Sequence, residues 1–299
     1  MSLLDGLNEK QREAAATTEG PLLILAGAGS GKTRTIIHRI AYIIEEGLAW
    51  PSQILAITFT NKAAGEMRER IAGMNVPESD RIWMSTFHAM CARIMRIHGK
   101  LLGYGENFVI YDTDDQKRLY KLIAKEMDLS DKMYPFNYVI GEISDAKNHY
   151  WNVSQYEKKA AGDFRKEKVS QVYRRYEEAL RQNNAMDFDD LIFNTLTLFK
   201  TQPEVLKHYQ DRFHYILVDE YQDTNHSQYE LVNLLASGYR NLCVCGDDDQ
   251  SIYRWRGADI RNILDFEKDY PDAKVVKLEE NYRSTPVILE AANQVIAHN

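Results

Sequence analysis

Short apolar runs recur along the chain, and helical patterns separate several of them. The runs are Leu22–Ala26, Ile54–Phe59, Ile82–Met84, Tyr215–Val218, Leu242–Cys245 and Val275–Leu278. Turn residues or polar clusters bound each run, which is typical of a buried strand. An isoleucine stripe at helical spacing follows the first run, and a similar pattern over residues 63–71 follows the second. Alternating strands and helices predict an α/β fold with a mostly parallel sheet covered on both faces.

Residues 26–33 read Ala-Gly-Ala-Gly-Ser-Gly-Lys-Thr, between the first apolar run and the isoleucine-striped helix. A phosphate-binding loop requires this context, although its first position is usually glycine rather than alanine. Glycines allow a tight turn whose N–H groups point at phosphate oxygens, and the next helix adds the positive end of its dipole. Lys32 would reach the β- and γ-phosphates and Thr33 would ligate Mg²⁺. We expect the loop backbone to contact phosphate through Gly27, Ala28, Gly29, Ser30 and Gly31.

A pair of acids, Asp219 and Glu220, ends the apolar run Tyr215–Val218. At the carboxyl end of a central strand, Asp219 can hold magnesium through water, and Glu220 can orient and deprotonate an attacking water. Acidic pairs alone are weak evidence because they are common on surfaces. Here they end a fully apolar strand in a chain that also carries a phosphate loop, so they predict triphosphate hydrolysis.

Helical patterns dominate from about residue 112 to residue 184. The block opens with Thr113-Asp-Asp-Gln116, which we interpret as a capping box. The economical interpretation is a helical subdomain inserted into the α/β domain. Between Lys158 and Arg175, seven basic residues meet only Asp163 and Glu167. This stretch is either a solvated helix face or a DNA-contacting surface, and the sequence leaves both open.

Composition limits the alternatives. A hydrophobic fraction of 44% with 27% charged residues is ordinary for a soluble globular protein. No apolar run approaches the roughly 20 residues that span a bilayer, and no signal pattern is present, so we expect a cytoplasmic protein without a membrane partner. The net charge of −7 argues against a uniformly basic surface but permits a local basic groove. Cys91, Cys243 and Cys245 lack metal-ligand spacing, and we expect reduced, buried thiols.

Several segments, in this order, resemble the UvrD/PcrA/Rep family of superfamily-1 DNA helicases. They are Ile57-Thr-Phe59-Thr-Asn61-Lys62-Ala-Ala, Ser85-Thr86-Phe87-His88, Asp219-Glu220-Tyr-Gln222-Asp, Gly246-Asp-Asp-Asp-Gln250-Ser-Ile-Tyr253-Arg-Trp255-Arg256-Gly-Ala and Glu280-Asn-Tyr282-Arg283-Ser. The resemblance covers the whole chain, most firmly residues 7–100 and 186–285. It implies a RecA-like P-loop NTPase domain, the cofactors ATP and Mg²⁺, and 3′ to 5′ movement on single-stranded DNA. The cellular pathway, whether DNA repair or replication, is not readable.

The resemblance also assigns residues to the nucleotide. Gln11, in Leu7-Asn8-Glu-Lys-Gln11, matches an adenine-reading glutamine; with Asn8 it would also cap a helix, and both roles can coexist. Arg34 and Tyr282 match positions that pack on adenine, where an aromatic face can stack. Gln250 and Arg283 match residues that sense the γ-phosphate. They would complete the catalytic group of Lys32, Asp219 and Glu220.

A track for single-stranded DNA and its junctions with duplex is a further implication. The matching positions are Phe59, Asn61, Thr86, His88, Tyr253, Trp255 and Arg256. Aromatic rings suit such a track because stacking holds any base, at about 1–3 kcal/mol per base. Phe59 could instead be a core strand residue, and the role of His88 is equally open.

The family arrangement divides the chain into a motor domain (1–109 and 188–280), an inserted accessory domain (110–187) and the start of a second motor domain (281–299). The remainder of that second domain would supply an arginine worth about 10³–10⁵ in rate. We therefore expect this chain alone to bind ATP weakly, hydrolyse it very slowly and unwind no duplex. The stripe after Ser284-Thr285-Pro286 predicts a helix with little to pack against.

Two other classes of function compete with a helicase. One is a non-catalytic, nucleotide-dependent DNA-binding module. The other is a different phosphate-loop enzyme, such as a small-molecule kinase. That enzyme would leave the Gly246–Ala258 stretch unexplained, and no acceptor pocket is readable.

Overall fold

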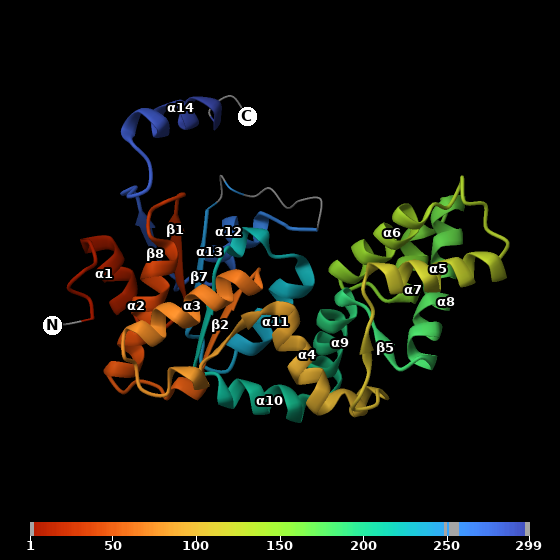
Figure 1. The fold of residues 1–299 in the computed structure, drawn as a ribbon, viewed down its shortest axis with the longest axis horizontal. Coiled ribbons are helices and arrows are strands. Elements are labelled where there is room, and N and C mark those ends of the chain that lie inside the picture. The colour runs from red at the N-terminus through yellow and green to blue at the C-terminus, as the bar shows by residue number, and fades with distance from the viewer. Residues whose placement is uncertain (1–2, 248–249, 251–256, 297–299) are drawn as a thin grey trace. The chain divides into compact units, whose positions relative to one another are not determined.

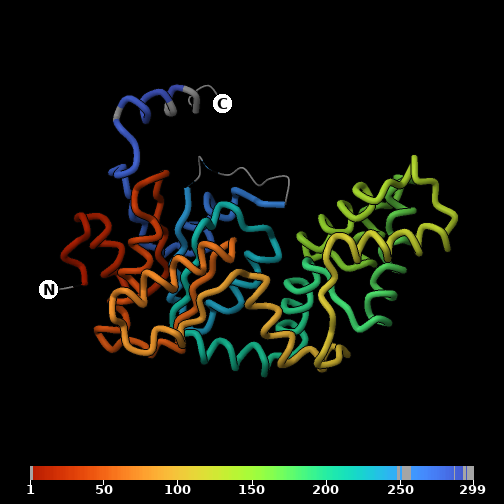
Figure 2. The backbone as a smooth tube through the Cα atoms, viewed as in Figure 1, coloured from red at the N-terminus to blue at the C-terminus, as the bar shows by residue number. Residues whose placement is uncertain are grey.

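The computed structural model describes residues 3–247, 250 and 257–296, and the chain forms two compact units. Unit 1 comprises Met1–Phe87, Lys207–Thr224 and Asn233–Asn299, and unit 2 comprises His88–Leu206 and Asn225–Val232. Figure 2 follows the chain from unit 1 (red and orange) through the helices of unit 2 (yellow and green) and back to unit 1 (cyan and blue).

Unit 1 is built on a six-stranded sheet with the strand order β3-β2-β6-β7-β1-β8 (Figure 1). The strands are β1 (Leu22–Ala26), β2 (Ile54–Thr58), β3 (Trp83–Thr86), β6 (Tyr215–Val218), β7 (Leu242–Gly246) and β8 (Lys274–Leu278). All five pairings between these strands are parallel. The predicted α/β fold with a parallel sheet is confirmed, and strand ends differ from prediction by at most two residues. One difference matters for the site: β2 ends at Thr58, so Phe59 lies beyond the strand.

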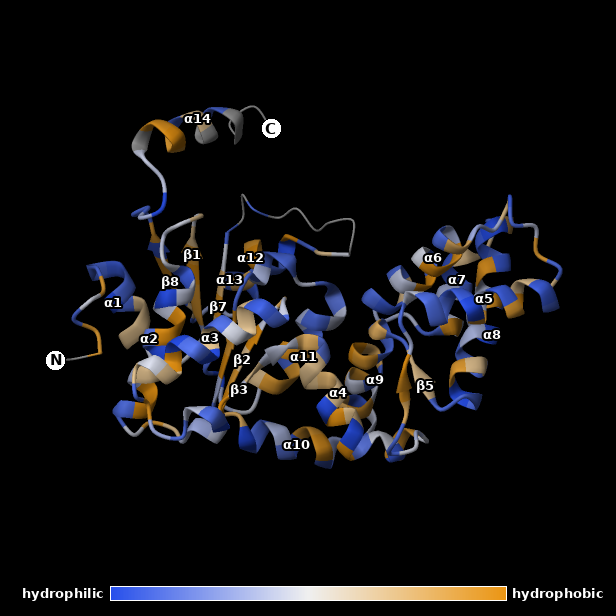
Figure 3. Ribbon diagram, in the orientation of Figure 1, coloured by the Kyte–Doolittle hydropathy of each residue, from blue (hydrophilic) through white to orange (hydrophobic). Residues whose placement is uncertain are grey.

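The core follows from the alternation of side chains along the strands. Helices α1 (Glu9–Ala16), α2 (Lys32–Glu45) and α3 (Asn61–Gly73) pack a cluster that includes Ile36, Ile40 and Met67 against Leu22 and Ile24 of β1. On the opposite face, Leu23, Ile57, Val218 and Val244 of the central strands are buried as well. Both faces of the sheet are therefore covered, which explains why its strands are almost wholly hydrophobic (Figure 3).

The other elements of unit 1 are shorter. They are η1 (Pro51–Gln53), η2 (Ser79–Arg81), η4 (Tyr221–Asp223), α12 (Arg261–Leu264), α13 (Phe266–Asp269) and α14 (Pro286–Ile296), while α10 (Pro203–Arg212) and α11 (His226–Ala236) contribute residues to both units. Helix α14 begins at Pro286, as predicted, and its Val287 and Ile288 are exposed. Among the described residues, none of the helices combines the length and apolar character that a bilayer crossing requires.

Unit 2 is mainly helical. After α4 (Phe87–His98) and η3 (Gly99–Leu102) come α5 (Thr113–Glu126), α6 (Phe136–Asn148), α7 (Val153–Ala160), α8 (Phe164–Gln182) and α9 (Phe188–Thr201). It also holds a two-stranded parallel sheet, β4 (Val109–Ile110) with β5 (Ala185–Met186). The predicted insertion is therefore not wholly helical: β-strand residues lie at both of its ends.

The predicted capping box at the start of α5 was one residue out of place. The N-cap is Asp112, whose carboxylate accepts hydrogen bonds from the N–H groups of Asp114 and Asp115, both at 2.9 Å. Thr113 is the first helical residue. Both registers offer a polar cap with an acceptor three residues later, so the sequence pattern alone could not distinguish them.

Several charges in unit 2 form ion pairs within the unit. The ammonium group of Lys147, fully buried, lies 2.7–2.9 Å from carboxylate oxygens of Asp190, Glu177 and Asp187. Within the basic stretch on α8, Arg174 pairs with Glu157 and Arg175 pairs with Glu126 at 2.8 and 2.9 Å. Such pairing favours the solvated helix face over a DNA-contacting surface for this stretch.

Candidate nucleotide-binding site

The phosphate loop connects β1 to α2 in the conformation that anion binding needs. Gly29 and Gly31 have φ values of 76° and 86°, a region that side chains rarely tolerate. Ser30 Oγ donates to Gly27 O at 2.7 Å and closes the turn. Gly31 is the N-cap of α2 and offers no side-chain acceptor to the N–H groups of the first turn. These N–H groups are available to phosphate oxygens at the positive end of the helix dipole.

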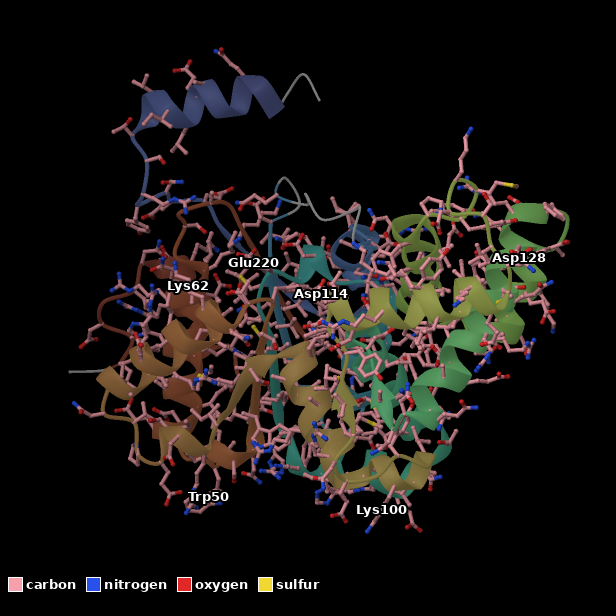
Figure 4. All side chains as sticks on the ribbon, turned by 45° about the vertical axis from the view of Figure 1, so that its right-hand side comes forward. Trp50, Lys62, Lys100, Asp114, Asp128 and Glu220 are labelled. Atoms are coloured by element: carbon pink, nitrogen blue, oxygen red, sulfur yellow. The ribbon has the colours of Figure 1, made fainter. Side chains whose placement is uncertain are left out.

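The four side chains that the sequence predicts to act in triphosphate hydrolysis meet in one place. Lys32 Nζ lies 3.0 Å from Glu220 Oε2, and Thr33 Oγ1 donates to Asp219 Oδ2 at 3.4 Å. The acids directly follow β6, and the backbone N–H of Asp219 donates to Ile57 O of the neighbouring strand at 2.9 Å. Figure 4 labels Glu220. Its backbone has a φ of 53°, the left-handed region that is costly for a non-glycine residue and is often found at functional sites.

The charges of the site suit the binding of Mg²⁺ and phosphate groups. Burial, together with the charge of Glu220, raises the pKa of Asp219 to about 6. Burial lowers the pKa of Lys32, but the carboxylates of Glu220 and Asp219 outweigh it and raise that pKa above its usual value. Thr33 and Asp219 supply hard oxygen ligands, and Mg²⁺ commonly takes one or two such protein ligands together with waters and phosphates. The residues present therefore fit a magnesium nucleotide.

Asp219→Asn is expected to stabilise the protein at neutral pH while removing a predicted metal ligand. Because the folded-state pKa is raised, the wild type gains stability from a protonated Asp219 below about pH 4 and loses about 3 kcal/mol of it as the pH rises through 6. The amide never ionises and so avoids that loss. Urea unfolding at pH 4 and pH 7 should show equal stability at pH 4 and a more stable variant at pH 7. If the variant and the wild type were equally stable at both pH values, the raised pKa of Asp219 would be contradicted. If the variant kept full Mg²⁺-dependent ATP binding, the predicted metal role of Asp219 would be contradicted.

An amide that the sequence analysis did not assign links this site to the next strand. Gln222 is 1% exposed; its Nε2 donates to Glu220 Oε2 at 2.9 Å, and its Oε1 accepts from the N–H of Asp247 at 3.1 Å. Gln250 Nε2 in turn donates to the Asp247 carboxylate. A Cβ on Gly27 would lie 3.9 Å from that carboxylate. The predicted sensor Gln250 is thus connected to the phosphate loop and to Glu220.

The predicted adenine residues come from three segments: Gln11 from α1, Arg34 from the first turn of α2 and Tyr282 from the segment after β8. Asn8 and Gln11 form a capping box, which confirms the helix-cap interpretation, and Gln11 Nε2 also donates to Ser30 O of the phosphate loop at 2.9 Å. Arg34 donates to Gly6 O at 2.7 Å. The exposed Tyr282 accepts from Asn8 Nδ2 at 2.7 Å. Gln11, Arg34 and Tyr282 are therefore gathered around one end of the phosphate loop.

Arg283 is also brought to the phosphate loop, through a residue that the sequence analysis left unassigned. Asn281 Oδ1 accepts from the N–H of Arg283 at 2.9 Å, and its Nδ2 donates to Ala28 O. The N–H of Tyr282 donates to Gly29 O at 2.9 Å. A Cβ on Gly29 would lie 2.7 Å from Arg283 Cβ, so glycine is required at that position for steric reasons too.

Part of the predicted DNA track follows the carboxyl ends of β2 and β3, at the same edge of the sheet as the phosphate loop. Phe59 is half-buried and meets Phe87 edge to face, with ring centroids 5.7 Å apart. Asn61 is exposed at the first turn of α3, and Thr86 is buried at the end of β3. Phe59 is therefore not a strand residue of the sheet core.

Within unit 2, His88 meets the ring of Phe188 edge to face, with centroids 5.8 Å apart. Burial lowers the pKa of His88, which favours a neutral imidazole. Phe188 is 51% exposed, although it opens helix α9 beside an otherwise buried stretch. Phe188 is a further candidate for contact with bases that the sequence analysis did not name. Its only signal in the sequence is a phenylalanine in the first turn of a helix, next to acidic residues. Tyr253, Trp255 and Arg256 lie outside the described residues.

A parallel sheet with a phosphate loop after β1 and a paired acid after β6 defines a P-loop NTPase domain. More narrowly, the chain belongs to the family described as UvrD/REP helicase N-terminal domain, whose model matches residues 7–271. It is 53% identical over 298 residues to "ATP-dependent DNA helicase PcrA" of Staphylococcus aureus (strain Mu50), covering 100% of this chain and 41% of the relative. It is 55% identical over 297 residues to the protein of the same name from Bacillus subtilis (strain 168), covering 99% and 40%. The chain thus spans about two fifths of the length of these relatives.

Proposed function

We propose that this chain carries the ATP site and part of the single-stranded DNA site of an ATP-dependent DNA helicase. The observation that carries the proposal is the meeting of Lys32 with Glu220 and of Thr33 with Asp219 at the carboxyl edge of the sheet. The family resemblance supports movement in the 3′ to 5′ direction and binding at junctions of single-stranded and duplex DNA. It also supports the division into a motor domain, an accessory insertion and the start of a second motor domain at residue 281.

In the proposed mechanism, Lys32 changes partner. Without a triphosphate, its ammonium group neutralises Glu220; with one, it binds the β- and γ-phosphates and releases the carboxylate. Mg²⁺, when bound, would be held by Thr33 and, through water, by Asp219, and would neutralise phosphate charge. Glu220 then orients a water and accepts its proton, while loop N–H groups hold the phosphates in place.

DNA and ATP are coupled through the same edge of the sheet. Gln250 and Arg283 sense the γ-phosphate, and Gln222 connects Glu220 to the segment that leads to Gln250. In unit 1, Phe59 offers a half-buried ring to bases at this edge. Since stacking tolerates every base, such a track suits movement along any sequence.

The proposal predicts linked binding of ATP and DNA. A fluorescein-labelled single-stranded oligonucleotide is titrated with the chain, and anisotropy is measured with and without a non-hydrolysable ATP analogue and Mg²⁺. We expect the analogue to change the affinity for DNA by at least about fivefold, and by linkage DNA must change analogue affinity equally. Lys32→Ala should remove this linkage without removing DNA binding.

Equal DNA affinity with and without the analogue would contradict the proposal. Phosphate release by the chain alone should be very slow. A longer form of the protein then decides between the two functions. If it also fails to hydrolyse ATP but still links ATP binding to DNA binding, the chain belongs to a non-catalytic, nucleotide-dependent DNA-binding module instead.

A further inference from the structure

Unit 1 has a cavity at the edge of the sheet opposite the phosphate loop. Its volume is about 550 Å³, within the range of about 300–1,000 Å³ that is usual for binding pockets. It lies where β2 and β6 begin, because Gln53 directly precedes β2 and His214 directly precedes β6. Glu220 follows the other end of β6. Figure 4 accordingly shows Trp50 and Glu220 at opposite ends of unit 1.

The wall of this cavity is mostly apolar, with a few polar groups. The apolar side chains come from Ile44, Leu48, Ala49, Trp50, Pro51 and Pro77. Gln53 and His214 are joined to each other, with 2.9 Å between Nε2 atoms, and the third polar group is Glu78. A mainly apolar wall with a small number of placed polar groups is the usual composition of a ligand site.

The apolar surface continues beyond the cavity mouth. Trp50 is 72% exposed and Leu48 is 43% exposed. Next to His214 lies the ring of Tyr239, tilted by 32° with ring centroids 4.0 Å apart, and Tyr239 is 45% exposed. Exposed aromatic side chains around a pocket are typical of protein interfaces. A small metabolite would fill only the cavity, whereas a peptide can cover both the cavity and its apolar rim.

The charged residues around the cavity indicate which kind of partner can bind there. Glu45 and Glu46 directly precede Gly47 of the cavity wall and form no ion pair within the described part of the chain. Glu78 pairs with Arg81 at 3.1 Å, and Asp80 lies between them in the chain. The surroundings are thus acidic overall, which disfavours a second copy of a chain whose own net charge is −7.

From these observations we propose that the cavity at the start of β2 and β6 is a docking site for a peptide segment of a partner protein. The segment inserts an aromatic or aliphatic side chain between Leu48, Trp50 and Pro77. Lysine or arginine residues on either side of that anchor face the acidic surroundings. The site is independent of the nucleotide and lies at the opposite edge of the sheet from it.

The test uses the ¹⁵N-labelled chain and the indole N–H signals of its four tryptophans. Trp50→Phe identifies the Trp50 signal by its disappearance. The probe is the tetrapeptide acetyl-Lys-Leu-Phe-Lys-amide, with acetyl-Glu-Leu-Phe-Glu-amide as its charge-reversed control. We expect the basic peptide to shift the Trp50 signal saturably and leave the other indole signals in place, and the acidic peptide to bind at least about tenfold more weakly.

Two variants locate the binding. Leu48→Lys should weaken the basic peptide at least about tenfold, because it adds a like charge and removes part of the anchor site. Leu264→Lys, a matched change at another exposed leucine of unit 1, should leave the affinity within about twofold. Affinity for the ATP analogue should not change in either variant.

Three results would overturn the proposal. The first is that millimolar basic peptide causes no saturable shift of the Trp50 signal. The second is that the two peptides bind equally. The third is that, without peptide, the chemical shift of Trp50 changes with protein concentration. The last result would assign the face to self-association. If the wild type did not bind the ATP analogue, the proposed nucleotide site would be contradicted but the docking site would not. The two proposals can therefore fail separately.

Discussion

In a longer form of the protein that includes the second motor domain, Lys32→Ala is expected to slow phosphate release from ATP by about 10²–10³-fold or more. The reason is that the variant loses the cation that the proposed mechanism places on the transferring phosphoryl group. The ammonium group lies in a 10% exposed position and pairs with Glu220, so its charge acts in a partly desolvated site. Its contacts with the ground-state triphosphate disappear as well, and the affinity for magnesium ATP should fall at least about tenfold. Single-turnover phosphate release and titration with a fluorescent ATP analogue measure the two effects.

Lys268→Ala is the control for this experiment, since Lys268 is exposed and pairs only locally with Asp265. It should leave both quantities unchanged. Unfolding of Lys32→Ala is not expected, because the partner carboxylate of Glu220 is 36% exposed and can be hydrated when the ammonium group is removed. Undiminished hydrolysis by Lys32→Ala would remove the phosphate loop from the mechanism.

Glu220→Gln should separate binding from hydrolysis. The amide cannot accept a proton from water, and loss of a general base costs about 10²–10⁴-fold in rate. Magnesium ATP should bind at least as tightly as in the wild type, because the neutral side chain no longer competes with phosphate for Lys32. The same two assays apply: hydrolysis is lost and affinity is kept, whereas Lys32→Ala loses both. A variant that binds and hydrolyses ATP like the wild type would show that Glu220 is not the base.

Gln222→Ala offers a graded comparison. It leaves the carboxylate in place but removes the amide that holds Glu220 Oε2 and the N–H of Asp247. Hydrolysis should fall less than in Glu220→Gln, because the proton acceptor remains and only its orientation suffers.

Local patterns were sufficient to predict much of the fold. Strands β1 and β6 were predicted within their exact bounds because fully buried parallel strands are short, wholly apolar and bounded by turn residues. The phosphate loop was equally readable, since its glycines and Lys32 are neighbours in the chain. The start of α5 was misplaced by one residue because two caps of similar strength lie side by side at Asp112 and Thr113. The strands β4 and β5 were missed because a two-residue strand has no detectable period.

Contacts between segments that are distant in the chain could not be predicted from local sequence patterns. Gln222 and Asp247 are far apart in the chain, and a glutamine after two acids is ordinary in a sequence. Asn281 reaches Ala28 only because β8 lies beside β1 in the sheet. The exposed ring of Phe188 and its contact with His88 likewise depend on helices that begin at distant residues.

By itself, the sequence determined the α/β fold, the phosphate loop with Lys32 and Thr33, and the acids that end β6, because short-range apolar patterns and glycine geometry specify them. Only the tertiary structure decided that Lys32 pairs with Glu220, that Gln222 connects Glu220 to the residue after β7, and that a cavity opens where β2 and β6 begin. The strand order of the sheet sets those distances, and a linear pattern does not contain it.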